Sequence, residues 1–164
     1  MKKTVTGVLA IVIAMAGMLL FAGCSSTGGA PTSIAASDLA DVKDLAQRFV
    51  DSINRKDIDG TMACVWNSPK MIWVNFGTVV WGYDGFRNGL SQMFENNETV
   101  RIAVTDISYV PVGENIMAVG TATIDLQPKD GGAPQHVVER WTDVERKIDG
   151  RWVYVLDHTT LVPE

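Results

Sequence analysis

Two side chains in the last quarter of the chain, Asp143 and His158, are of the types that transfer protons. A carboxylate beside an imidazole orients the ring and favours its protonated form, which prepares the pair for general acid–base chemistry. The two residues belong to separate runs rich in β-branched and aromatic residues, 136–148 and 151–161. Such chemistry therefore requires that the two runs pair and present both side chains on one face.

The dipeptide between the two runs, Asp149-Gly150, predicts that they form a hairpin. A type I′ turn needs positive φ at both central residues, which Asp-Gly readily provides. With a two-residue loop, the numbers of facing residues add up to about 299. The predicted pairs include Trp141 with His158, Asp143 with Leu156, and Val144 with Val155.

One face of this predicted hairpin combines acidic, aromatic and hydroxyl side chains: Glu139, Trp141, Asp143, Trp152, Tyr154, Leu156, His158 and Thr160. Asp143 and His158 are diagonal neighbours there, within reach of each other through one water molecule. A slip of one residue would instead turn Arg140, Thr142 and Asp157 inward and make the face cationic.

Aromatic residues near this face are the predicted walls of a ligand pocket, namely Trp66, Trp73, Trp141 and Tyr154. Structural roles remain open for all of these residues. Tryptophans are mostly core residues, and a histidine on a last strand often only satisfies a neighbouring carboxylate. Asp143 could equally pair with Arg140 or Arg146.

The composition of the 164-residue chain indicates one globular domain with a net charge of −5, which disfavours a nucleic-acid partner. Two histidines and two cysteines are too few for a convincing zinc site, so no metal is predicted. Glycine-rich phosphate loops and Gly-x-Ser-x-Gly elbows are missing from the sequence, and no cofactor is predicted.

The first residues resemble a bacterial lipoprotein signal. Lys2 and Lys3 precede the apolar run 8–21, which ends in Phe21-Ala22-Gly23-Cys24. This resemblance implies a signal peptide over 1–23, lipid on Cys24 and a flexible tether over 24–36. Ser25 in place of Asp favours the periplasmic side of the outer membrane in a Gram-negative cell. An ordinary secretory signal or a transmembrane anchor is the alternative.

Hydrophobic periodicity predicts helices followed by strands. A long helix runs from an N-cap at Ser37 to Asn54, a short one from an Asp57 cap to Trp66, and a third follows an Asp84 cap. Strands are expected at 71–75, 78–81, 100–110 and 116–127, before the hairpin. This order predicts an α+β fold with three N-terminal helices against an antiparallel or mixed sheet.

Two long strands carry further signals. In 100–110 the apolar alternation changes phase, which predicts a β-bulge near Thr105-Asp106 and a bent, cone-shaped sheet. In 116–127 the core face carries Ala118, Gly120 and Ala122 in succession. The space above these small residues would be filled by helix backbone or would form a pocket.

The order of elements and the closing motifs resemble the SnoaL-like group of the nuclear-transport-factor-like superfamily over residues 38–162. The resemblance rests on five segments: Asn54-Arg55-Lys56-Asp57, Gly82-Tyr83-Asp84-Gly85-Phe86, Arg140-Trp141-Thr142, Gly150-Arg151-Trp152 and Asp157-His158-Thr159-Thr160. It implies a cone-shaped domain over 37–164 with a pocket between sheet and helices. It also implies frequent homodimers through the outer sheet face.

That superfamily includes ketosteroid isomerase, dehydratases and polyketide cyclases as well as non-catalytic binding domains, so the fold leaves the function open. We expect a membrane-anchored domain that binds a small, mostly apolar molecule, without established catalysis. One alternative is a metal-free lyase or isomerase that uses Asp143 and His158. A second alternative is a dimeric assembly module.

Overall fold

The structure, a computed structural model, describes residues 33–163. The predicted signal peptide, Cys24 and most of the tether lie outside this range. The elements are, in order, α1 (Ala36–Asn54), α2 (Ile58–Met62), β1 (Ile72–Asn75), β2 (Thr78–Trp81), α3 (Tyr83–Asn96), β3 (Asn97–Val112), β4 (Asn115–Pro128), β5 (Gln135–Ile148) and β6 (Arg151–Leu161). None of the described helices is long and apolar enough to cross a membrane.

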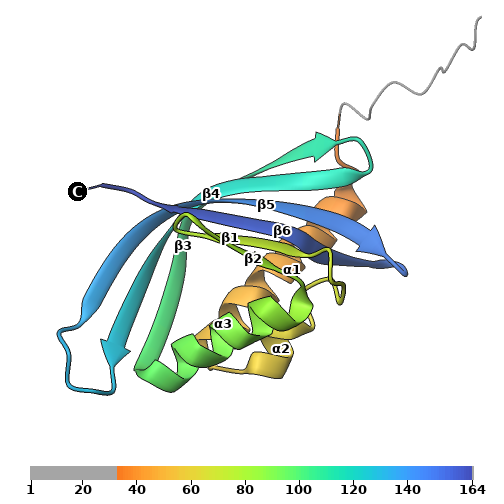
Figure 1. Cartoon of the computed structure of the whole chain (residues 1–164). Coiled ribbons are helices and arrows are strands. Elements are labelled where there is room, and N and C mark those ends of the chain that lie inside the picture. The colour runs from red at the N-terminus through yellow and green to blue at the C-terminus, as the bar shows by residue number, and fades with distance from the viewer. Residues whose placement is uncertain (1–32, 164) are drawn as a thin grey trace, which may run out of the picture.

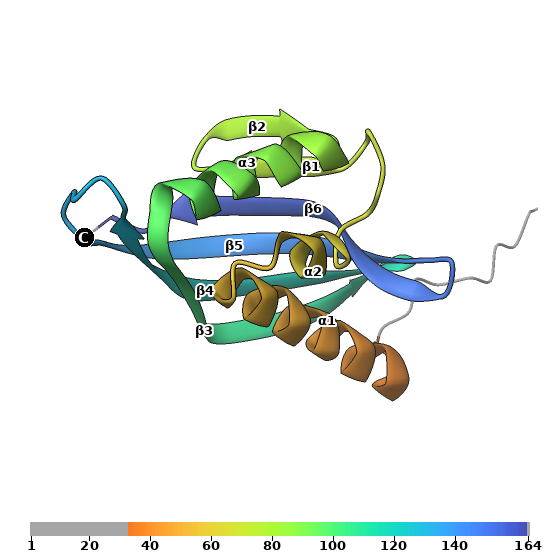
Figure 2. The same ribbon diagram turned by 90° about the horizontal axis from the view of Figure 1, so that it is seen from below.

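The strands form one curved sheet in the order β2-β1-β6-β5-β4-β3, and the helices cover one of its faces (Figure 1). Seen from below, α1 crosses the sheet near β3 and β4, whereas α3 lies over the β1–β2 end (Figure 2). Neighbouring strands are antiparallel except β1 and β6, which are parallel. The predicted α+β fold with a mixed, cone-shaped sheet is confirmed.

Helix α1 packs its apolar stripe on the sheet, and Val42 and Leu45 are fully buried. Its last residue, Asn54, holds it to β3 by two hydrogen bonds. The Asn54 side chain donates to the Ile102 carbonyl (3.0 Å) and accepts from the Ile102 amide (2.7 Å). The predicted Ser37 cap is wrong, because the helix begins two residues earlier than predicted, after Ala35, which offers no side-chain acceptor.

The next two helices also differ from prediction at one end each. Asp57 caps α2 as expected and accepts from the Gly60 amide (2.9 Å), but the helix ends at Met62. The chain leaves the helix there because residues 64–66 pair with the backbone of Tyr154. Helix α3 begins after Gly82, at φ 82°, so Asp84 lies in its first turn and is not its N-cap.

The predicted bulge in β3 is confirmed. Val104 faces Ala122 and Asp106 faces Thr121, which leaves Thr105 as the extra residue. The bulge keeps large apolar side chains on the helix-covered face in both halves of the strand, with Ile102 before it and Ile107 after it.

The last hairpin contains a second bulge, which the sequence analysis missed. Its turn is as predicted, with φ 50° at Asp149 and 78° at Gly150. The four pairs next to the turn follow the predicted register, from Ile148–Arg151 to Glu145–Tyr154. Val155 is then unpaired, and the next pair is Val144–Leu156.

Beyond Val155 the predicted register is wrong by one residue. Asp143 faces Asp157, Trp141 faces Thr159, and His158 faces Thr142. The shift occurs where the other edge of β6 changes its partner. Tyr154 exchanges backbone hydrogen bonds of 2.9 Å with Cys64 and Trp66, whereas Leu156 is the first residue that pairs with β1.

The space above the small residues of β4 is filled mainly by Trp141. Its ring packs on Ala118 and Ala122, which are both buried. A Cβ atom at Gly120 would lie 2.5 Å from Cζ2 of Trp141 and too close to the Asp106 carbonyl oxygen. Helix backbone does not take this place. The predicted pocket occupies part of it, because the cavity that opens beside the Trp141 ring is also lined by Ala122.

Candidate functional site

A cavity of about 500 Å³ lies between α1 and the covered face of β3–β6. Helix α1 contributes Phe49, Val50 and Asn54 to its wall, and the sheet contributes aromatic and apolar side chains: Ile102, Ile107, Tyr109, Trp141 and Tyr154. The Phe49 and Tyr154 rings meet edge to face, with centroids 5.0 Å apart. This volume and lining are typical of pockets for small molecules.

The floor of the cavity carries three acidic side chains, Glu139, Asp143 and Asp157. The bulge at Val155 brings them together, since it turns Asp157 to the covered face, directly opposite Asp143. Glu145 follows Asp143 on the same face of β5 and is completely buried. We call these four residues the carboxyl cluster.

Much of the carboxyl cluster lacks polar partners. One oxygen each of Asp143 and Asp157 and both carboxyl oxygens of Glu145 are buried without a hydrogen bond. No member takes part in an ion pair within residues 33–163. Burying charged carboxylates without partners costs several kcal/mol each, so the cluster is an energetic cost to the fold.

Burial consequently shifts the cluster towards its protonated forms. It raises the pKa of Glu139 to about 7 and that of Glu145 to about 8. Burial, with the charge of Glu139, raises the pKa of Asp157 to about 7. The pKa of Asp143 rises well above its ordinary value because of burial and then the charges of Asp157, Glu145 and Glu139. Near neutral pH the cluster therefore holds protons that it can exchange.

The structure brings only part of the predicted site together. Asp143, Trp141 and Tyr154 line the cavity. Trp73 packs into the core under α3, where its ring meets Phe86 edge to face at 4.8 Å. Trp66 borders a separate hollow together with Tyr83 and other residues.

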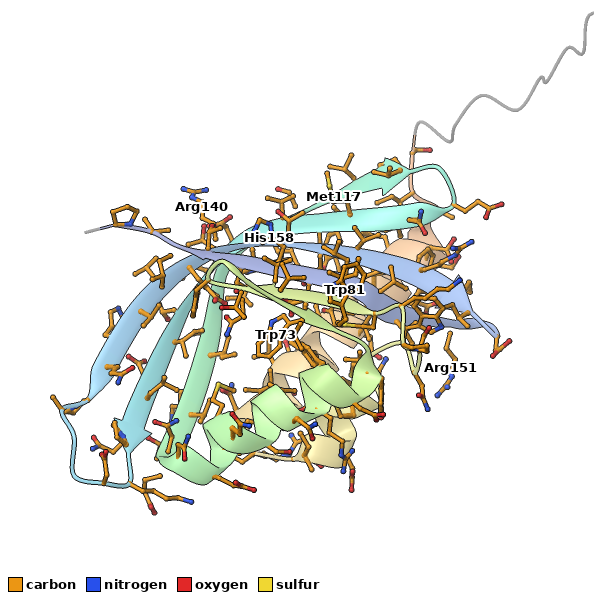
Figure 3. The ribbon with its side chains drawn as sticks, in the orientation of Figure 1. Trp73, Trp81, Met117, Arg140, Arg151 and His158 are labelled. Carbon is orange, nitrogen blue, oxygen red and sulfur yellow. The ribbon has the colours of Figure 1, made fainter. Side chains whose placement is uncertain are left out.

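His158 is not part of the cavity, and the predicted Asp143–His158 pair does not form. His158 shares the outer face of the sheet with its partner Thr142, while Asp143 faces α1. Figure 3 shows His158, Arg140 and Met117 on the side of the sheet away from α3, and Trp73 on the helix side. The alternative register, shifted by one residue, placed Arg140, Thr142 and Asp157 on the cavity face. It is correct for Asp157 alone, because Arg140 and Thr142 lie on the outer face of the sheet.

Sequence reasoning missed Asp157, Glu145 and Tyr109 as members of one site. A signal was present in β5, where Glu139, Asp143 and Glu145 share one face of a strand. For Asp157 the sequence gives almost no local signal. Residues Val153–Leu156 form an unbroken apolar run, so a bulge within the run does not visibly change the alternation of apolar and polar residues. Within the described part of the chain, no three His, Cys, Asp or Glu residues are grouped to hold a metal ion.

Residues 46–155 match the family model of the SnoaL-like domain. The chain belongs to the SnoaL-like domain family. No curated protein sequence matches it. The match includes α2, α3, β1–β5, the C-terminal part of α1 and the first residues of β6, and thus most of the SnoaL-like fold described above.

Solved structures of other proteins share this fold. A nuclear transport factor 2-like superfamily protein from Salmonella enterica is 17% identical to this SnoaL-like domain, with a TM-score of 0.73 over 79% of this chain and 95% of that one. A "putative dehydratase from the NTF2-like family" of Streptomyces avermitilis is 19% identical, with a TM-score of 0.68 over 78% and 98%. At these identities the likeness concerns the fold alone.

Proposed function

We propose that this SnoaL-like domain binds a small, mostly apolar molecule in the cavity under α1. The observation that carries the proposal is a cavity of about 500 Å³ with aromatic and apolar walls, acidic groups on its floor and a few further polar side chains from α1. Apolar walls supply affinity through burial, and a few convergent polar groups orient the ligand.

Native mass spectrometry of the protein purified from its own cells tests this proposal. We expect a mass above that of the polypeptide because a ligand is bound, and we expect denaturation to remove this extra mass. Ala46 lines the cavity, so Ala46→Trp should fill it and abolish the extra mass. The matched control is Ala40→Trp on the exposed side of α1, which should retain the extra mass. A bare polypeptide mass, or an extra mass retained in Ala46→Trp, would contradict the proposal.

The opposed Asp143 and Asp157 favour a second candidate function, metal-free elimination or isomerisation. Two buried carboxyls that repel each other tend to share one proton, so that one can act as acid and the other as base. This pair takes the place of Asp143 and His158 in the alternative from the sequence. A solved neighbour from Novosphingobium aromaticivorans named "Putative Scytalone Dehydratase", 8% identical with a TM-score of 0.71 over 77% of this chain and 85% of that one, is consistent with such chemistry in this fold.

Exchange of carbon-bound protons into D₂O, followed by NMR on 2-tetralone, tests the second candidate. We expect the wild type to accelerate exchange next to the carbonyl, and Asp143→Asn and Asp157→Asn to lose this acceleration. Asp106→Asn, at an exposed position on the outer face, makes the same chemical change as a control. Equal exchange rates with and without protein would refute this candidate function.

We also propose that two copies of the domain pair through the outer face of the sheet. This face is not covered by helices (Figure 1) and exposes five large apolar side chains, Val79, Trp81, Val110, Val112 and Val119. Apolar sheet surfaces of this kind mark protein interfaces, and a two-fold axis lets one patch bind its own copy. The register places all five on the face that carries His158.

Sedimentation of the wild type should accordingly report a dimer. Val119→Glu should shift the protein to a monomer, because the change buries a charge in the proposed contact. Leu161→Glu adds the same charge at an exposed apolar residue of the covered face and should leave the dimer intact. A monomeric wild type would argue against this interface.

We further propose that lipid on Cys24 attaches the protein to the periplasmic side of the outer membrane. The basis is the segment Phe21-Ala22-Gly23-Cys24 after an apolar run. Cys24→Ser should move the protein from the membrane fraction to the soluble fraction of disrupted cells. Cys64→Ser, at the only cysteine within the described residues, should leave it in the membrane fraction. Equal partition of both variants would refute the anchor.

A further inference from the structure

The carboxyl cluster concentrates acidic side chains on the floor of the cavity, where they destabilise the fold. Three carboxyl groups line one floor, and Asp143 and Asp157 stand directly opposite each other on neighbouring strands. Like charges at directly opposed positions destabilise a sheet. The oxygens Oδ1 of Asp143 and Oδ1 of Asp157 are buried without a hydrogen-bond partner. These unsatisfied acceptors lie in side chains that are more than nine-tenths buried, on the wall of a cavity large enough for a ligand.

The described protein supplies no cation to this floor. Lys43 belongs to the cavity wall on α1 but is exposed and forms no ion pair with the cluster. Arg48, one turn further along α1, is bound to Asp44 at 2.7 Å and also donates to the sulfur of Cys64. Once the carboxyls are ionised, an anionic ligand would therefore meet like charges on the floor of the cavity, and a neutral ligand without a hydrogen-bond donor would leave them unpaired.

We propose that the molecule bound in this cavity carries a positively charged nitrogen, which Asp143 and Asp157 bind together. This inference rests on the proposed binding function and names its ligand class, an apolar amine. The ammonium group donates charge-assisted hydrogen bonds to the carboxyl groups of Asp143 and Asp157, which line the cavity. The rings of Phe49, Tyr109 and Trp141 surround the apolar body and attract the charge through their π faces.

Binding of such a cation is coupled to loss of protons from the cluster. Burial raises the pKa of Asp157 to about 7, so a positive ligand must displace protons that the free protein still holds near neutral pH. Other titratable or charged groups face the same cavity: Lys43 and Asp51 from α1, Tyr109 from β3, Glu139 from β5 and Tyr154 from β6. Burial raises the pKa of Tyr109 to about 12, so its hydroxyl stays neutral over this pH range and adds no charge to the cavity. Affinity for the amine should thus increase from about pH 6 to about pH 8, as the carboxyls lose their protons.

Three probes with one apolar body test the inference: 2-aminotetralin, 2-tetralol and tetralin-2-carboxylate, titrated into the purified protein and followed by ligand-observed NMR. At pH 8 we expect the amine to bind about tenfold more tightly than the alcohol, and the carboxylate to bind least. The double variant Asp143→Asn, Asp157→Asn should bind amine and alcohol equally. The Asp106→Asn control should keep the preference for the amine.

The outcomes separate this inference from the proposed function. If the alcohol binds as tightly as the amine, or the preference persists in the double variant, the charged ligand is refuted while the binding pocket stands. If none of the three probes binds, both the pocket function and the charged ligand are refuted. Far-UV and near-UV circular dichroism establish that the variants are folded. The single variants Asp143→Asn and Asp157→Asn, each with a reduced preference, replace the double variant if it does not fold.

Discussion

Between about pH 5 and about pH 8 the protein should lose several kcal/mol of its free energy of unfolding, and Glu145→Gln should remove a substantial part of that dependence. Glu145 is completely buried in β5, and neither of its carboxyl oxygens has a hydrogen-bond partner. Burial raises the pKa of Glu145 from 4.5 to about 8. At about 1.4 kcal/mol per pKa unit, this one group accounts for a loss on the order of 4 kcal/mol.

The sign follows from the raised pKa in the folded state. Below pH 4.5 Glu145 is protonated in both the folded and the unfolded chain, and its contribution to stability is fully present. As the pH rises, the unfolded chain releases this proton first, while the folded protein keeps it until about pH 8. The unfolded state is therefore favoured progressively across this window, and stability falls. Glu139 and Asp157, with pKa values raised to about 7, act in the same direction.

Urea denaturation of the wild type and of Glu145→Gln at the two pH values measures the effect. The slope of stability against pH is the decisive quantity, because the buried amide of the variant has its own constant cost at every pH. Glu114→Gln is the matched control, since the Glu114 side chain is 91% exposed. A slope in Glu145→Gln equal to that of the wild type would show that Glu145 ionises normally.

The second large effect is expected at Gly120, where substitution by alanine should destabilise the protein by about 3 kcal/mol. A Cβ atom there would collide with the Asp106 carbonyl oxygen and with the ring of Trp141, 2.5 Å from its Cζ2 atom. Neither neighbour can move freely. The carbonyl belongs to the backbone of β3 beside the bulge, and the ring is packed against Ala118 and Ala122. The strain would also displace Trp141 from the cavity wall.

Chemical denaturation of Gly120→Ala measures this loss, and the emission of the tryptophans reports on the surroundings of Trp141. Gly132→Ala makes the same change in the loop between β4 and β5. Its new methyl group would meet only side-chain atoms, the nearest 3.0 Å away on Asp130. It should leave stability nearly unchanged. A Gly120→Ala variant as stable as this control would mean that β3 and Trp141 adjust without cost.

Most of the fold could be predicted because its signals are local. Val42, Leu45 and Ile53 recur at helical spacing, and the Asp-Gly turn sets the register of the residues next to it. The bulge in β3 was visible because Ile102 and Ile107, on either side of it, have opposite phase. Helix starts were less predictable, since Ala35 and Gly82 begin α1 and α3 without a side-chain cap.

The candidate site could be predicted only in part. Trp141, Asp143 and Tyr154 reach the cavity from strand positions that the hairpin register near the turn already indicated. Trp73 occupies a core position because α3 lies against its ring, with Gly89 leaving room for it. The position of α3 over β1 depends on packing between segments far apart in the sequence, and no local pattern reports it.

The amino-acid sequence by itself determined the α+β fold, the SnoaL-like family and one half of an acidic site, on β5. Tertiary structure alone decided that Asp157, and not His158, completes that site. The two residues are neighbours, and a single extra residue at Val155 exchanges the faces on which they lie. That residue is accommodated where β6 leaves its contact with residues 64–66 and begins to pair with β1. Both contacts join distant parts of the chain, so only the folded structure decides which side chain enters the cavity.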